Sequence, residues 1–171
     1  METWDAIRAR RDVRRYTDQP LEREELERIL EAGRRSPSSS NWQPWDFVVV
    51  TERAELADLS KVWAHAQHVA QSAATIALIA PVQEDALARD RVHYDLGQAT
   101  MSIMVAAADL GIGSGHSVVS EQDRARALLG FPDDRFCAYL IALGYPADRP
   151  LTPITRPNRR PFDDVVHWGR W

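Results

Sequence analysis

The 171-residue chain has a single cysteine, Cys137, so no disulfide can form within it. A lone cysteine also argues against a metal site built on cysteine. No apolar run approaches the roughly 18 residues that a bilayer-spanning helix needs. The opening residues, Met1-Glu2-Thr3-Trp4, begin no signal peptide, because no basic and then apolar stretch follows them. These absences predict a cytoplasmic protein without a membrane partner.

Lysine is almost missing as well, since Lys61 is the only one among 21 basic residues. The other basic side chains are guanidinium groups, whose planar forks suit phosphate and carboxylate. The formal net charge of −4 offers no general attraction for nucleic acid. A bound anion would therefore need a local cluster of arginines.

Composition and length are those of an ordinary globular chain, with 44% apolar and 27% charged residues. We predict one domain over residues 1–171, without internal repeats. Apolar spacing and end signals predict helices at about residues 2–11, 21–34, 53–63, 91–110 and 121–129. Continuous apolar runs predict strands buried on both faces at residues 47–50, 75–80 and 136–143.

Three segments lack such periodicity. Residues 81–90 are polar and are predicted to form a surface loop, and residues 111–116 are predicted to form a glycine-rich loop. The tail from residue 145 to the end carries prolines, arginines and two tryptophans, so it must pack on something to be ordered. The helix at 91–110 is apolar or small on nearly every side, which places it in the core or between subunits.

Two polar clusters allow two interpretations each. Residues 36–50 set Ser38, Ser39 and Asn41 between a helix and a strand, either as caps and turns or as a ligand cradle; composition alone favours the first. The arginines between residues 8 and 15 either offset the dipole at a helix end or clamp an anion.

The glycines at 111, 113 and 115 superficially resemble a nucleotide-binding loop. That fingerprint follows a strand, whereas this segment follows a predicted helix, so a Rossmann-type site is disfavoured. Glycines here would instead let backbone approach a flat ligand or a neighbouring strand. His116 is predicted to be a pocket-wall residue, and His65 and His68 lack the companion ligands of a metal site.

Four motifs in order resemble the nitroreductase family of flavin enzymes, over nearly the whole chain. The first is RRDVRRY at 10–16, and the second is SPSSSNWQPW at 36–45 before a valine strand. The third is YDLGQA at 94–99 leading to LGIG at 110–113, and the fourth is RRPFDDVVH at 159–167. Each is weak alone, but their order and spacing together identify the resemblance.

The resemblance implies an α+β fold with a mostly antiparallel sheet flanked by helices and a long buried central helix. It also implies a homodimer, with a C-terminal tail that crosses to the partner subunit and one FMN at each of two interfaces. In the family pattern, Arg10, Arg14 and Arg159 would hold the phosphate, and Arg11 would add backbone or side-chain contacts. The remaining cofactor contacts implied are Pro37, Ser38, Ser39 and Asn41 from the other subunit, Gln43 at the flavin edge or bracing the loop, Asp95 at the ribityl chain, and Gly115 and His116 at the ring.

One departure from the family pattern is Asp12, which stands where many members have serine. A carboxylate would repel the phosphate, so Asp12 is predicted to pair with Arg14 or Arg15, or to meet the ribityl or ring end through its backbone. The same string resembles the branch that fragments flavin to dimethylbenzimidazole, which is a minor alternative.

The resemblance implies an NAD(P)H oxidoreductase working by a two-step exchange. NADH or NADPH would reduce FMN and leave, and a nitroaromatic, quinone or enone would then be reduced in the same place. Since the flavin carries the hydride, no catalytic side chain is predicted. The alternatives from other classes are a flavin-binding protein without turnover and a purely structural homodimer.

Overall fold

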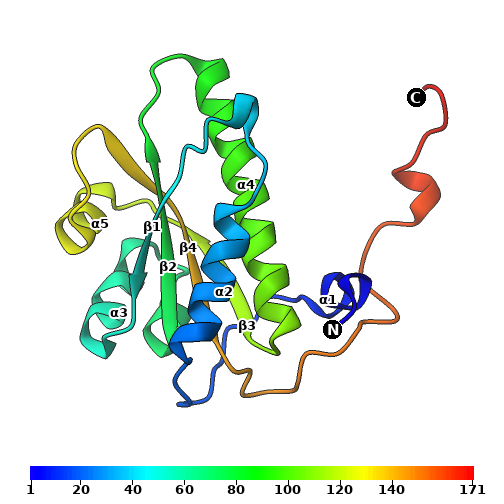
Figure 1. The fold of residues 1–171 in the computed structure, drawn as a ribbon, viewed down its shortest axis with the longest axis horizontal. Helices are drawn as coiled ribbons and strands as arrows, with labels where there is room; N and C mark the ends of the chain where they lie inside the picture. Colours follow the sequence, from blue (N-terminus) through cyan, green and yellow to red (C-terminus); the bar gives the residue numbers. More distant parts are fainter.

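A computed structural model describes all 171 residues and shows a four-stranded antiparallel sheet between two layers of helices (Figure 1). The spatial strand order is β1-β2-β4-β3, and every neighbouring pair is antiparallel. This confirms the predicted α+β class. The strands are β1 (Asp46–Val50), β2 (Ala74–Pro81), β3 (Gly113–Val118) and β4 (Arg135–Gly144), and the α-helices are α1 (Thr3–Ala9), α2 (Arg23–Arg34), α3 (Arg53–Leu59), α4 (Ala86–Asp109) and α5 (Gln122–Leu129).

Each face of the sheet has its own apolar core, because the central strands alternate their side chains between the two faces. Ala77 and Ile79 of β2 join a cluster with α3 and α5, whereas Ile76 and Leu78 join a cluster with α2 and α4. The two central strands are buried on both sides, as their apolar runs predict. The predicted burial holds for β2 and for most of β4.

The strand β1 differs from the prediction of a strand buried on both faces. It lies at the edge of the sheet, and Val49 is 37% exposed. A run of valines has the same appearance whether the strand is central or peripheral, and only the pairing order decides.

The long helix α4 is confirmed, but it begins at Ala86, inside the segment predicted to be a loop. Asp85 caps it by accepting a hydrogen bond from the backbone N–H of Ala88 at 2.7 Å. Gly111 ends it with a φ of 77°, in the left-handed region that glycine accepts. The helix therefore runs for 24 residues along the sheet.

The glycine-rich segment is a strand and not a loop. Residues 113–118 pair with β4 along their length as the edge strand β3. Glycine disfavours strands intrinsically, so this strand owes its existence to hydrogen bonds with residues distant in sequence.

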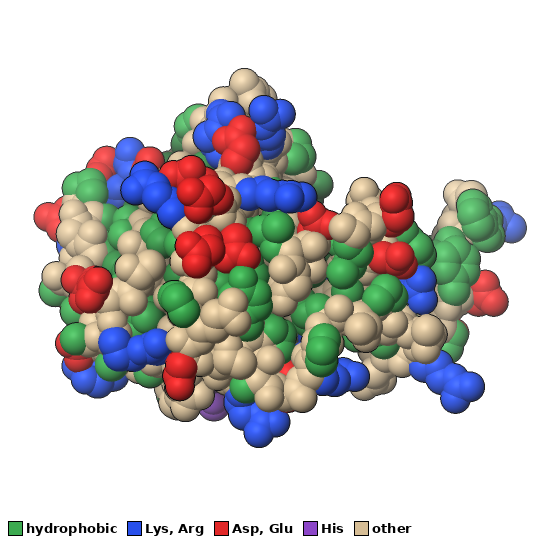
Figure 2. All heavy atoms as spheres, turned by 60° about the horizontal axis from the view of Figure 1, so that its bottom comes forward, with side chains coloured by type: hydrophobic (Ala, Val, Ile, Leu, Met, Phe, Trp, Pro, Cys, Tyr) green, Lys and Arg blue, Asp and Glu red, His purple; other side chains and the backbone are tan.

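The tail has two parts. Up to residue 154 it packs on its own chain, where Leu151 is buried and the backbone N–H of Ile154 donates to the carbonyl of Arg8 at 3.1 Å. Beyond that it stands away from the body and exposes apolar side chains (Figures 1 and 2). Trp168 is 84% and Trp171 98% exposed. No helix of this fold has the length and hydrophobicity to cross a membrane.

Candidate functional site

The segment after α1 lies along the free edge of β3 and brings the arginine motif to the sheet. The backbone N–H of Val13 donates to the carbonyl of Ser114 at 2.9 Å, and Asp12 forms a parallel bridge with Ser114. A Cβ on Gly115 would meet the carbonyl oxygen of Val13 at 2.4 Å, and a Cβ on Gly113 would meet the Val13 side chain. The glycines therefore allow the close approach of a neighbouring segment, one of the two predicted uses.

Asp12 pairs with Arg10 and His116, and not with Arg14 or Arg15 as predicted. Its Oδ1 lies 3.4 Å from a guanidinium nitrogen of Arg10 and 3.7 Å from Nδ1 of His116. The His116 imidazole lowers the pKa of Asp12, and Asp12 in turn raises the pKa of His116. The strand β3 decides this pairing, because it sets His116 beside the segment that carries Asp12.

Five arginines near this segment line two separate hollows. Arg8, Arg10 and Arg159 line a hollow of about 380 Å³ together with apolar residues and a threonine. Arg14 and Arg15 line another of about 310 Å³ with two histidines and two glutamines. Neither hollow has a carboxylate among its lining residues, so both favour an anion or an electron-rich edge.

Arg11 has a different environment. Its guanidinium donates to Asp148 at 2.7 Å and to the carbonyl of Arg149 at 2.9 Å. The Arg11 guanidinium lowers the pKa of Asp148 to about 2. In this chain the Arg11 side chain thus holds the start of the tail.

His68 is a site residue that the sequence did not single out for flavin. Its side chain is buried, and Nε2 lies 3.4 Å from the carbonyl of Gly115 and 3.5 Å from Oγ of Ser117. Burial lowers the pKa of His68, which favours the neutral imidazole. The signal in the sequence is the spacing of His65 and His68, which by itself indicates neither a metal site nor a contact with β3.

The serine loop is anchored by Asp95 of α4, which is fully buried. The backbone N–H of Ser39 donates to both carboxyl oxygens of Asp95 at 3.0 Å, and the Ser39 hydroxyl donates to Oδ1 at 3.2 Å. The backbone N–H of Gln43 donates to the Ser38 hydroxyl at 2.9 Å. Asp95, implied at the ribityl chain, here braces the loop.

The loop backbone is strained at three residues that are not glycine. Ser40, Asn41 and Gln43 have φ values of 52°, 56° and 56°. Such conformations cost free energy and persist where the surrounding structure enforces them, often at ligand sites. The strain and the buried anchor go beyond what a plain connecting loop needs.

Within one chain the two sets of candidate residues do not meet. The serine loop follows the upper end of α2, whereas the segment after α1 and the edge strand β3 lie toward the lower end of α4 (Figure 1). The first set contains Pro37, Ser38, Ser39, Asn41, Gln43 and Asp95, and the second contains Arg10, Arg11, Asp12, Arg14, Gly115, His116 and Arg159.

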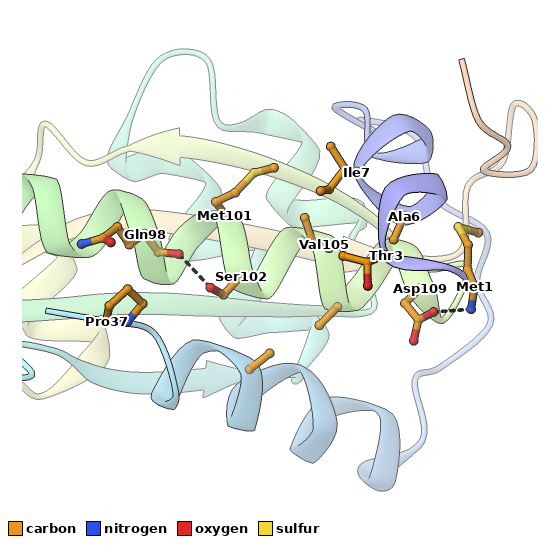
Figure 3. A pocket seen from close by; sticks show the side chains of 12 residues that line it. Met1, Thr3, Ala6, Ile7, Pro37, Gln98, Met101, Ser102, Val105 and Asp109 are labelled. Atoms are coloured by element: carbon orange, nitrogen blue, oxygen red, sulfur yellow. Dashed lines mark hydrogen bonds and ion pairs between the residues drawn. The ribbon is translucent and has the colours of Figure 1, made fainter. Parts of the chain in front are cut away.

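An apolar groove of about 610 Å³ connects these regions along α4. Ile7 of α1 and Met101 and Val105 of α4 point into it, and Pro37 and Gln98 lie at its other end (Figure 3). Met101 is 41% and Ile7 39% exposed, so a single chain leaves apolar surface of this groove in contact with water, which is unfavourable.

Comparison with known proteins assigns this chain to a family. A model described as the nitroreductase family matches residues 7–84 and 60–145. The chain belongs to the nitroreductase family. Its members include NAD(P)H nitroreductases and flavin oxidoreductases, and they are generally dimeric flavoproteins.

Individual members of the nitroreductase family agree with the chain over its whole length. A protein of Archaeoglobus fulgidus, provisionally named NADH dehydrogenase/NAD(P)H nitroreductase, is 35% identical over 169 residues, which cover 96% of each chain. The NADH dehydrogenase of Thermus thermophilus is 29% identical, over 93% of this chain and 92% of that one. The structure of an FMN-dependent nitroreductase from Clostridium difficile has a TM-score of 0.85 at 23% identity, covering 97% and 98%, which shows the shared fold.

The donor groups of this nitroreductase-family chain fit FMN. A phosphate needs guanidinium groups that are not already consumed by carboxylates, and Arg159 bonds only the carbonyl of its neighbour Asn158. The Arg10–Asp12 contact is long at 3.4 Å and leaves other donors of Arg10 free. The glycines of β3 do not add to this fit, because the space beside Gly113 and Gly115 is taken by Val13 and His68.

Proposed function

We propose that the chain is an FMN-dependent NAD(P)H oxidoreductase that reduces electron-poor acceptors such as nitroaromatics, quinones or enones. The observation that carries the proposal is the convergence of Arg10 and Arg159, 149 positions apart in sequence (159 − 10), on one hollow without a carboxylate. Such a pair matches a phosphate dianion, which prefers bidentate guanidinium contacts. The family membership supplies the class of reaction.

In this proposal the chain binds the two ends of the cofactor with different groups. Arg10 and Arg159 take the phosphate, and the backbone of Arg11 lies beside them. Arg14, expected at the phosphate, is placed at the ring end in this proposal. It shares its hollow with His68, which contacts Gly115. Gly115 and His116 border the ring.

The second half of the site comes from another copy of the chain. The serine loop lies near the opposite end of α4 from the arginine segment, so it cannot complete the site of its own chain. We therefore place its residues on the cofactor of the partner: Pro37, Ser38, Ser39, Asn41 and Gln43. Asp95 acts through Ser39 as the brace of this loop. Gln43 also braces the loop, since its side-chain amide donates to the carbonyl of Asn41 at 3.1 Å.

Three features support a homodimer in which α4 is central. The groove beside α4 leaves Met101 and Ile7 exposed, and the tail leaves its tryptophans exposed. A Cβ on Gly97 would meet nothing within 4 Å. Glycine inside a helix costs about 1 kcal/mol relative to alanine, and nothing within this chain requires it. A second copy of the chain packed closely against α4 would explain why this position has no side chain.

Bound FMN supplies hydride transfer, and the chain supplies binding, orientation and exclusion of water. The strained serine loop, fixed by a buried carboxyl, is suited to hold one flat ligand in one orientation. Sequential use of one stacking place by NAD(P)H and by the acceptor gives ping-pong kinetics, with no covalent bond to the protein.

The test is spectroscopic. Purified protein, reconstituted with FMN and freed of excess, should retain yellow flavin absorbance that bleaches anaerobically with NADH or NADPH. The colour should return when a quinone or nitroaromatic is added, and the product should be the reduced acceptor. Protein that takes up no FMN would refute the proposal.

The competing functions give different results in the same experiment. A flavin-binding protein without turnover keeps the absorbance but is not bleached faster than free FMN. An enzyme that fragments flavin loses the flavin spectrum irreversibly in air and forms dimethylbenzimidazole, detectable by mass spectrometry. A purely structural homodimer takes up no flavin.

A further inference from the structure

The pair of Asp12 and His116 is the one acid–imidazole contact at the proposed ring end. The separation of 3.7 Å joins Oδ1 of Asp12 to Nδ1 of His116, so the other ring nitrogen, Nε2, is not engaged by Asp12. The His116 side chain is 49% exposed, and the strand β3 that carries it fixes its backbone. An imidazole whose Nδ1 faces a carboxylate at ion-pair distance, and whose Nε2 has no hydrogen bond, has the arrangement of a proton carrier.

The charged groups around this pair come from two other segments. Arg10 and Arg14 face it from the segment after α1, and His68 faces it from the turn Gln67–Gln71. Asp12 favours a positive charge on His116, whereas burial and the two arginines disfavour it. Asp12 prevails, and the pKa of His116 lies above its ordinary value.

We propose that His116 is a catalytic residue that gives a proton to the acceptor, and that Asp12 is the positioning residue that keeps His116 protonated and oriented. This rests on the proposed function, since it assigns a role beside the proposed flavin ring. This role of His116 depends on the carboxylate at position 12. A serine at that position would carry no charge to offset the nearby arginines.

The proton is needed in only one of the two half-reactions. Reduction of FMN by NADH would be a hydride transfer, which would require no proton from the protein. In the second half-reaction the bound flavin would supply a hydride, which carries two electrons, and a quinone that accepts it would become a hydroquinone anion. A proton from Nε2 of His116 completes the hydroquinone, and His116 regains a proton from water.

His68 is a poorer candidate for the same role. It is buried, its Nε2 already lies near the carbonyl of Gly115, and burial lowers its pKa. The neutral form cannot serve as an acid. His116 differs in being half-exposed and beside a carboxyl group.

The proposal is tested by separating the half-reactions in anaerobic stopped-flow experiments. The wild type, His116→Gln and Asp12→Asn are loaded with FMN, reduced with NADH, and mixed with menadione or with ferricyanide, an electron acceptor that takes no proton. At pH 7, His116→Gln should slow oxidation by menadione by about 100-fold or more, the usual size of general acid catalysis. Oxidation by ferricyanide should change less than about three-fold.

The pH profile adds a readout that a merely structural role would not move. In the wild type, oxidation by menadione should slow as pH rises through the raised pKa of His116. Asp12→Asn should shift that fall to lower pH, because the imidazole loses the carboxylate that favours its charge. The same shift should appear in the NMR titration of the His116 ring in protein without flavin. His93→Gln, a histidine beside Tyr139 in β4, is the matched control and should leave both half-reactions unchanged.

The outcomes distinguish the two proposals. Wild-type protein that takes up no FMN contradicts the proposed function, whereas the NMR titration still tests the pair by itself. Wild-type protein that bleaches and recovers, with His116→Gln equally fast toward menadione, overturns only the role of His116. Equal slowing toward both acceptors also overturns it, since proton transfer would not be the step lost. A His116 titration unmoved in Asp12→Asn overturns the role of Asp12.

Discussion

The backbone N–H of Ser39 donates to both carboxyl oxygens of Asp95, each at 3.0 Å, and this contact ties the serine loop to the middle of the sheet's longest helix. The two residues are 56 positions apart in sequence. Because Asp95 is fully buried, water cannot replace either partner if the other is lost.

Asp95→Asn should therefore destabilise the protein by about 1–3 kcal/mol, the range for a buried polar group left without its partner. The amide keeps the shape but presents a donor to the donating N–H of Ser39. Urea unfolding measures the loss, and a flavin titration should show weaker FMN binding, because the loop no longer holds its strained backbone. Asp90→Asn, on the exposed surface of the same helix, should change neither.

Arg10→Ala and Arg159→Ala should each weaken FMN binding by about 1.5–3 kcal/mol, the range for hydrogen bonds to charged groups. Riboflavin, which lacks the phosphate, should bind wild type and variants with equal affinity. Fluorescence titration with both ligands measures the difference. Arg23→Ala, a fully exposed arginine of α2, is the control. If riboflavin binding falls as much as FMN binding, the two arginines do not hold the phosphate.

Gly97→Trp should dissociate the proposed homodimer, because Tyr94, Gly97 and Met101 share the exposed face of α4. Light scattering coupled to size-exclusion chromatography measures the mass, and loss of the dimer should be accompanied by loss of bound flavin. The same substitution on α3, Ala54→Trp, lies on the other face of the sheet and should leave the mass unchanged. A Gly97→Trp protein that stays dimeric would place the interface elsewhere.

The ion pair between Arg11 and Asp148 predicts a pH dependence of stability. The folded pKa of Asp148, about 2, lies below its ordinary value of 3.8. A carboxyl whose pKa falls on folding stabilises the protein above its unfolded pKa, and this contribution fades as pH drops toward the folded pKa. Asp148→Asn should thus be less stable than wild type at pH 7. The difference in urea midpoints should shrink from about pH 4 downward; a difference independent of pH would mean that the ion pair contributes nothing.

Elements with strong local signals could be predicted from the sequence. The helix α2 has Glu22 and Glu25 arranged as a capping box and a buried stripe through Ile29, all within a few turns. The strand β2 is apolar at nearly every position, as its place in the middle of the sheet requires. The motifs of the arginine segment and the serine loop likewise identified the family, which the comparisons confirm.

Features that depend on distant neighbours could not be predicted this way. The glycine-rich strand β3 was expected to be a loop, since nothing local favours a strand there; pairing with β4 and contact with Val13 create it. The predicted ion-pair partner of Asp12 was wrong for the same reason, because His116 comes close to Asp12 only through the pairing of β3. The run of valines in β1 could not show that its strand lies at the edge.

The sequence by itself determined the long helix, through its apolar composition, and the family, through the order of its motifs. The resemblance to that family in turn implied the class of fold and the residues available for a flavin. The tertiary structure alone decided which of those residues meet. It brings Arg10 to Arg159, Asp12 to His116 and Ser39 to Asp95, and it keeps the serine loop apart from the arginine segment. These contacts depend on strand order and on packing along α4, which involve residues far apart in the chain.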